Sequence, residues 1–91
     1  MTVVQSDVKR EWHSRSFSCD LWTDPAGRVW QDFSHASNEL LMLVEGEIEL
    51  EMEGETFKPG ISEEILIPAG ISHTVRNIGA TTNRYLYGYK I

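Results

Sequence analysis

Two histidines and one glutamate are the residues of this sequence best suited to chemistry. His35 and Glu39 are separated by three residues, and His73 comes from a later segment. Imidazole nitrogens and a carboxylate oxygen together can hold a first-row divalent metal on one side and leave other positions open. The spacing therefore predicts a metal site. A purely structural role for the three side chains is the alternative, because a histidine followed four residues later by a glutamate is a common pattern.

Alternation of apolar and polar residues predicts short antiparallel strands around these positions. No long stretch keeps a helical period, and pairs of Pro, Gly and Asp residues mark turns between the alternating segments. We therefore predict an all-β fold, a small antiparallel β-barrel or jelly roll that closes on itself. Residues 1–91 form one domain, in which residues 1–15 are an N-terminal segment of less certain structure. The predicted strands are 16–21, 28–35, 39–44, 47–53, 56–58, 64–67, 73–77 and 84–89.

Strand geometry also predicts which side chains accompany His35. In the segment 28–35, Gln31 and Phe33 fall on the same face as His35, whereas Trp30 falls on the opposite face. In the last strand Tyr85, Tyr87 and Tyr89 share a face, and their hydroxyl groups can donate hydrogen bonds. We assign substrate binding to Gln31, Phe33, Tyr85 and Tyr87, with core or interface packing as the alternative for the tyrosines.

Composition excludes several classes of partner. The chain has 91 residues, with 8 Lys and Arg against 14 Asp and Glu, and a net charge of −6. Nucleic acid and acidic membrane surfaces are therefore poor partners. The longest apolar run, residues 40–44, is far too short to cross a bilayer. Cys19 is the only cysteine, so no intrachain disulfide is possible, and we expect a cytoplasmic protein.

The segment 39–44 is apolar on both faces, so something must cover each side. Leu40, Met42 and Val44 form an outer stripe that a second sheet or a second copy of the chain would hide. A chain of this size also buries a modest share of its surface on folding. We therefore expect a homodimer.

The motifs around the two histidines resemble those of the cupin family. The family's first motif, G-x5-H-x-H-x3,4-E-x6-G, is similar to the segment 33–46, with His35, Glu39 and Gly46 at matching positions. Its second motif, G-x5-P-x-G-x2-H-x3-N, is similar to the segment 68–77 at all four later positions. The matching residues of this second motif are Pro68, Gly70, His73 and Asn77.

The resemblance implies a small cupin barrel in which His35, Glu39 and His73 bind a divalent Fe, Mn, Ni, Co, Cu or Zn ion. It departs at Phe33, which stands where the family commonly has another histidine, and at Ser62, where the family has a glycine. Three protein ligands still suffice for many catalytic metals. The resemblance allows dioxygenase-, isomerase- or decarboxylase-like chemistry on a small organic molecule. A metal-free or structural-metal module that binds or senses a small molecule is the alternative, and enzyme status stays open.

The remaining candidates favour structural roles. His13 lies near the terminus and is expected at the surface. Cys19 is expected in the core rather than as a nucleophile. Trp22 and Trp30 flank the first hairpin, where packing is favoured over stacking on a substrate.

Overall fold

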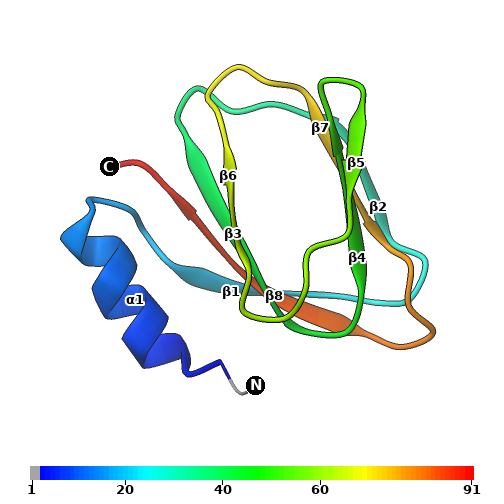
Figure 1. Ribbon diagram of the computed structural model, residues 1–91, viewed down its shortest axis with the longest axis horizontal. Helices are drawn as coiled ribbons and strands as arrows, with labels where there is room; N and C mark the ends of the chain where they lie inside the picture. Colours follow the sequence, from blue (N-terminus) through cyan, green and yellow to red (C-terminus); the bar gives the residue numbers. More distant parts are fainter. Residues whose placement is uncertain (1–2) are drawn as a thin grey trace.

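The computed structural model describes residues 3–91, which form one helix followed by eight strands (Figure 1). The two longest strands, β3 and β8, pair with each other at the centre of one sheet. The helix is α1 (Gln5–Ser14), and the strands are β1 (Asp20–Asp24), β2 (Val29–Phe33), β3 (Glu39–Glu45), β4 (Ile48–Met52), β5 (Glu55–Phe57), β6 (Glu64–Ile67), β7 (His73–Asn77) and β8 (Asn83–Tyr89).

The strands form two antiparallel sheets of four strands each, packed face to face (Figure 1). One sheet has the order β1-β8-β3-β6 and the other the order β2-β7-β4-β5. The chain crosses between the sheets several times, as in a jelly roll, and the all-β prediction is confirmed. β6 and β7 coincide with the predicted segments 64–67 and 73–77.

The apolar core between the sheets comes from residues that alternate along the strands. Leu41 and Leu43 of β3 point inward and pack with Ile48 and Leu50 of β4. All four are at most 2% exposed, so this core is closed to water. The glutamates between the β4 residues point the other way, as period-two alternation requires.

The segment 1–15, whose structure the sequence left less certain, contains the helix α1. Val8 and Trp12 are four residues apart, and so lie on one face of α1. Figure 1 shows α1 against the outer side of the sheet that contains β1, β8 and β3. There Trp12, fully buried, packs with Leu40 of β3, while Met42 and Val44 border the same cluster. The outer stripe is therefore covered by α1, and a second copy of the chain is not needed to hide it.

The segment between α1 and β1 crosses β8 closely at Gly88. A Cβ atom at Gly88 would lie 1.8 Å from the Ser18 carbonyl oxygen, so only glycine fits. After α1 the chain turns sharply, with Ser16 at φ 65°, and Phe17 forms only an isolated bridge to Lys90. The first strand consequently begins at residue 20 instead of the predicted residue 16. Within residues 3–91, no helix is long and apolar enough to span a membrane.

Candidate metal centre and its aromatic cavity

His35, Glu39 and His73 come together at one end of the space between the sheets. Glu39 is the first residue of β3, His73 is the first residue of β7, and His35 lies in the loop before β3. The backbone N–H of Gly70 donates a hydrogen bond to the His35 carbonyl oxygen at 2.8 Å. Gly70 has φ +79°, a conformation that glycine adopts without strain. The turn before β7 thus holds the His35 loop beside His73.

The three side chains are spaced like ligands of one ion. His35 Nε2 lies 3.4 Å from Glu39 Oε1, and His73 Nε2 lies 3.6 Å from the same oxygen. One ligand atom from each residue lies within 4.8 Å of the others. Two donors that bind one ion at about 2.1 Å, at about 90–110° to each other, are roughly 3.0–3.4 Å apart. Only small side-chain movements are needed for all three to reach a shared ion.

A backbone contact orients His73 for this role. Its Nδ1 lies 3.2 Å from the carbonyl oxygen of Ile71, to which an Nδ1–H group can donate. This tautomer leaves the lone pair of Nε2 directed at Glu39. A hydrogen bond from the far nitrogen to a carbonyl is the usual support for a metal-binding histidine.

The electrostatics of Glu39 and His35 favour a bound cation. Glu39 is 6% exposed, and burial raises its pKa to about 7. Its Oε1 accepts no hydrogen bond within residues 3–91. Burial lowers the pKa of His35, and the neighbouring His73 lowers it further. His35 is therefore less able to supply the positive charge that an ionised Glu39 needs, whereas a divalent cation would supply it. The donor set fits such an ion.

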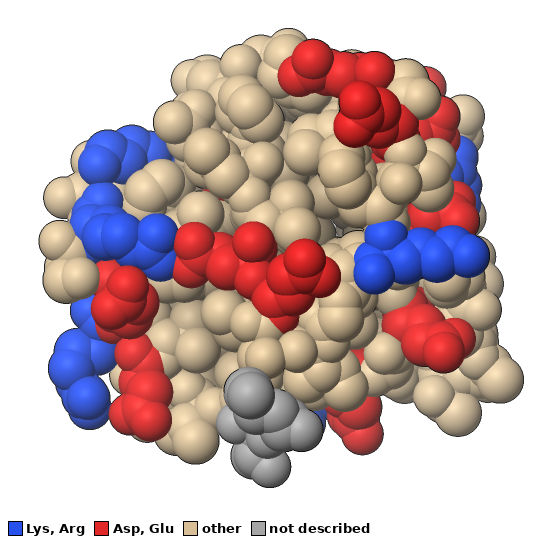
Figure 2. Space-filling view, viewed as in Figure 1, with Lys and Arg blue, Asp and Glu red and all other residues tan. Residues whose placement is uncertain are grey.

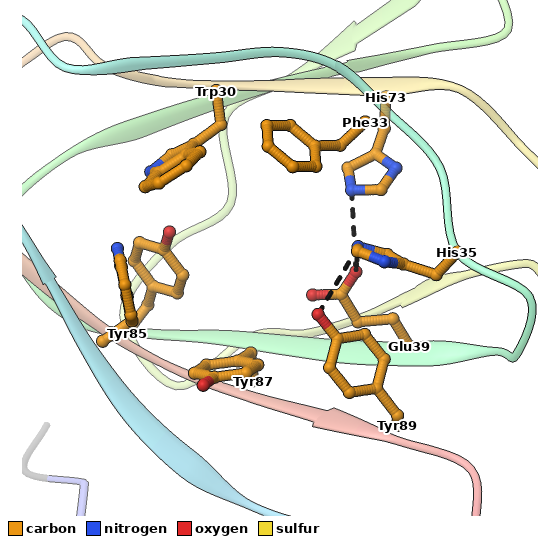
Figure 3. A pocket seen from close by; sticks show the side chains of 9 residues that line it. Trp30, Phe33, His35, Glu39, His73, Tyr85, Tyr87 and Tyr89 are labelled. Carbon is orange, nitrogen blue, oxygen red and sulfur yellow. Dashed lines mark hydrogen bonds and ion pairs between the residues drawn. The ribbon is translucent and has the colours of Figure 1, made fainter.

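A cavity of about 180 Å³ adjoins the three residues. Figure 3 shows that aromatic rings surround its open centre, with His35, Glu39 and His73 together on one side. Phe33, 41% exposed, stacks on His35 with ring centroids 6.3 Å apart and offers no donor atom for a metal. The other lining residues, all aromatic, are Trp22, Trp30, Tyr85, Tyr87 and Tyr89.

The predicted faces of β2 are wrong at Gln31 and Trp30. The register with β7 shifts between Trp30 and Phe33, and Asp32 has φ 54°, so a bulge interrupts the alternation. Trp30 and Phe33 consequently both line the cavity, although they were expected on opposite faces. Gln31 is exposed and lies with Asp32 along a polar depression that shares His73 with the cavity, and Gln31 itself does not line the cavity.

The tyrosines of β8 lie where alternation placed them. Tyr85, Tyr87 and Tyr89 all line the cavity. The Tyr89 hydroxyl lies 3.4 Å from His35 Nε2. Burial, together with the negative charge of Glu39, raises the pKa of Tyr89 to about 12, so its phenol stays protonated at neutral pH. Tyr89 is thus a hydrogen-bond donor beside the candidate ligands.

Sequence reasoning missed Asp24 at the opposite end of the cavity. Its carboxylate accepts hydrogen bonds from the indole N–H groups of Trp22, at 2.8 Å, and Trp30, at 3.0 Å. The Tyr85 hydroxyl donates to the same carboxylate at 3.1 Å. Trp22 and Asp24 are two positions apart on β1, so their contact could have been predicted from the local sequence. Tyr85 is 61 positions from Asp24, so that contact could not.

The remaining candidates lie elsewhere. His13 is exposed on α1, and it is not part of the cluster of ligands. Cys19 is 3% exposed among the apolar residues beneath α1, and burial raises the pKa of its thiol. His13 therefore lies apart from the candidate ligands. Cys19 is not expected to react, because a buried, protonated thiol is a poor nucleophile.

Comparison with solved structures supports the same architecture. The DMSP lyase DddQ of Ruegeria pomeroyi matches with a TM-score of 0.74 and 23% identity, over 84% of this chain and 39% of that one. A predicted oxalate decarboxylase of Thermotoga maritima matches with a TM-score of 0.74 and 18% identity, over 90% of this chain and 73% of that one. A cupin superfamily protein of Desulfitobacterium hafniense covers the whole chain, with a TM-score of 0.74, 16% identity and 74% of its own length.

Sequence comparison gives a similar picture. The polyketide synthase CurC of Streptomyces cyaneus is 30% identical over 63 residues, which are 69% of this chain. The chain spans only 41% of the length of that relative. The model of the cupin domain family matches residues 20–89, from the first residue of β1 to the last of β8. The chain therefore belongs to the cupin domain family.

Proposed function

We propose that this cupin binds one divalent transition-metal ion through His35, Glu39 and His73 and holds a small organic molecule in the adjoining cavity. The observation that carries the proposal is Glu39 Oε1, a buried acceptor without a hydrogen bond in residues 3–91, between two imidazole nitrogens. An unpaired buried acceptor is unfavourable, and a shared cation would satisfy it. Which of Fe, Mn, Ni, Co, Cu and Zn the site binds depends on the availability of each metal as well as on the type of ligand.

An enzymatic role fits the same site. When bound, a metal ion supplies Lewis-acid or redox chemistry to an oxygen-bearing substrate, as dioxygenase- or isomerase-like reactions require. The aromatic walls offer apolar surface to the occupant, and the protonated Tyr89 hydroxyl beside His35 can donate a hydrogen bond to it. The similar structures of a DMSP lyase and a predicted oxalate decarboxylase support an enzyme.

Elemental analysis by mass spectrometry tests the metal site. Protein purified without chelator is compared with Glu39→Gln, which keeps the side-chain shape, and with His73→Ala. His13→Ala is the matched control, because His13 is exposed and outside the ligand cluster. We expect about one metal per chain in the parent and in His13→Ala, and none in the other two variants. A parent that stays empty after incubation with each of the six ions and dialysis would contradict the proposal.

A metal-free binding module is the second candidate, and Phe33 is the observation that favours it. Phe33 pairs with His73 across β2 and β7 and reaches the cavity without a donor atom. Among residues 3–91, three donor residues then surround the candidate ion. An organic ligand that binds with equal affinity to the parent and to Glu39→Gln, both shown to be free of metal, would support this role.

A homodimer and a cytoplasmic location stay predictions. The stripe that suggested a dimer is covered by α1, so the remaining support is apolar surface elsewhere, such as Leu66 on the edge strand β6, which is 51% exposed. Sedimentation at several concentrations tests the dimer, and a single monomeric species throughout would rule it out.

A further inference from the structure

The aromatic end of the cavity is built on a buried negative group. Asp24 is 3% exposed, and both of its carboxylate oxygens accept hydrogen bonds from neutral donors. Indole N–H groups can only donate, so Asp24 serves them as an acceptor, the role of an ionised carboxylate. Within residues 3–91, no Lys, Arg or His forms an ion pair with Asp24. Asp24 therefore has no basic partner within residues 3–91 and lies behind the rings of the cavity wall that donate to it.

The rings around Asp24 are arranged as the walls of a box. Trp22 and Trp30 meet at 68° with centroids 5.7 Å apart, Trp22 and Tyr87 at 85° and 6.2 Å, and Trp30 and Phe33 at 69° and 5.3 Å. Figure 3 shows Trp30, Phe33 and Tyr87 around the open centre, with Trp30 across it from His35. Because the planes of neighbouring rings are steeply inclined to one another, more than one ring face can contact a single occupant.

Such a box attracts cations. A cation within about 6 Å of ring centroids is drawn to the negative faces of Trp and Tyr. Hydrogen bonds from the indole N–H groups to Asp24 polarise both indoles further toward a negative face. One ring already shows this behaviour, because the Arg28 guanidinium lies 4.0 Å from the centroid of Trp30. Arg28 does not line the cavity, and no Lys or Arg is among its lining residues within residues 3–91.

We propose that the cavity takes a small zwitterion, with a methylated ammonium or similar onium group in the aromatic box and a carboxylate directed at His35, Glu39 and His73. The position of the carboxylate rests on the proposed metal site, whereas the position of the onium group in the aromatic box does not. The cavity of about 180 Å³ is smaller than the roughly 300 Å³ at which pockets for drug-sized ligands begin, so the occupant is compact.

A pair of ligands of equal shape tests the onium group. Glycine betaine and 3,3-dimethylbutanoate differ in whether the branched atom is a charged nitrogen or a neutral carbon. Calorimetry on the metal-loaded protein should show betaine binding about 2- to 30-fold more tightly, the range expected for cation–π contacts of about 0.5–2 kcal/mol. Equal affinity, or a preference for 3,3-dimethylbutanoate, would overturn the proposal without bearing on the metal site.

Tetramethylammonium separates the two halves of the proposal. This cation has no carboxylate, so we expect it to bind the metal-free protein and to compete with betaine. Asp24→Asn should reduce the preference for betaine over its carbon analogue, while Asp20→Asn, exposed on the same strand, should keep it. A parent that does not bind tetramethylammonium, or an Asp24→Asn variant with an unchanged preference, would contradict the box. Because the parent comparison needs no variant, it decides the question even if Asp24→Asn does not fold.

Discussion

The two ends of the cavity are each built around a buried carboxylate, and the two carboxylates differ in their partners. Glu39 is 6% exposed and Asp24 is 3% exposed, so their burial is similar. Asp24 accepts hydrogen bonds from two indoles and a phenol, whereas Glu39 Oε1 accepts none within residues 3–91. Burial alone therefore does not make a carboxylate available to a ligand; the absence of donors does.

The surroundings of each carboxylate follow from this difference. Asp24 is part of the framework, because its acceptors are used to hold Trp22, Trp30 and Tyr85 in place. Glu39 faces nitrogen atoms that can themselves bind a cation. The charged side chains on the surface are not separated in this way. On the face shown in Figure 2, acidic and basic side chains are interspersed.

The strongest test of this contrast is the loss of the Glu39 charge. Glu39→Gln should lower metal affinity roughly 1,000-fold, or about 4 kcal/mol, because losing even a residue that merely supports a ligand lowers affinity about 10- to 100-fold. Competition with a chromophoric chelator measures this change. The matched Asp24→Asn variant should stay within about 10-fold of the parent. Equal losses in both variants would show that the two carboxylates do not differ as described.

The pH dependence of the metal-free protein gives the next largest effect. Burial raises the pKa of Glu39 from 4.5 to about 7, so the folded state holds this proton more tightly than the unfolded state does. The associated stability is fully present below pH 4.5 and is lost as the pH rises through about 7. The loss amounts to about 3 kcal/mol. Urea unfolding at pH 5 and pH 8 measures it.

Two controls accompany that measurement. Glu39→Gln cannot titrate at this position and should lose less stability than the parent between pH 5 and pH 8. Metal-saturated protein should also keep its stability, because the cation takes the place of the proton. A metal-free parent that is equally stable at both pH values would show that Glu39 is less desolvated than its position indicates.

Much of the fold and of the candidate ligand set was predictable because the deciding patterns are local. The segments 64–67 and 73–77 alternate cleanly and follow turn residues, and both are strands with the predicted bounds. Tyr85 and Tyr87 reach the cavity because nothing interrupts the alternation of β8. Glu39 and His73 each begin a strand, which is where the sequence reading put them.

The parts that were missed depend on contacts between distant residues. α1 is stabilised by packing against β3 and β8, which its own short sequence does not reveal. The bulge at Asp32 depends on a positive φ that aspartate tolerates but seldom signals. The hydrogen bond from Tyr85 to Asp24 joins opposite ends of the chain. The bulge explains why Gln31 was predicted on the wrong face. The distant Tyr85–Asp24 contact explains why the aromatic box was not predicted.

The framework role of Asp24 predicts a loss of stability. In Asp24→Asn an N–H₂ group replaces one acceptor, so an indole N–H that faces it loses its partner, and the remaining hydrogen bonds no longer go to a charged group. We expect the free energy of unfolding to fall by about 2 kcal/mol. Urea unfolding followed by tryptophan fluorescence measures the change. Asp20→Asn should change stability by less than about 0.5 kcal/mol. If the two variants are equally stable, the Asp24 network does not support the fold.

A third carboxylate, Glu64, shows what a paired and partly exposed acid contributes, and it gives the smallest expected effect. Glu64 accepts hydrogen bonds from Arg15 and from the Trp12 indole, which ties α1 to β6. The Arg15 hydrogen bond lowers its pKa. The stability it contributes is present above pH 4.5 and is lost as the pH falls further, opposite in sign to that of Glu39.

Glu64→Gln removes the charge and keeps an acceptor for Trp12. At pH 7 it should reduce the free energy of unfolding by less than about 1 kcal/mol, because the Glu64 and Arg15 side chains are 32% and 40% exposed and water screens the pair. The difference between variant and parent should shrink as the pH is lowered from 7 to below 4.5, because Glu64 becomes increasingly protonated there. Glu55→Gln, on an exposed position of β5, should match the parent throughout this pH range. A difference that stays the same as the pH is lowered would mean that Glu64 acts through its shape rather than its charge.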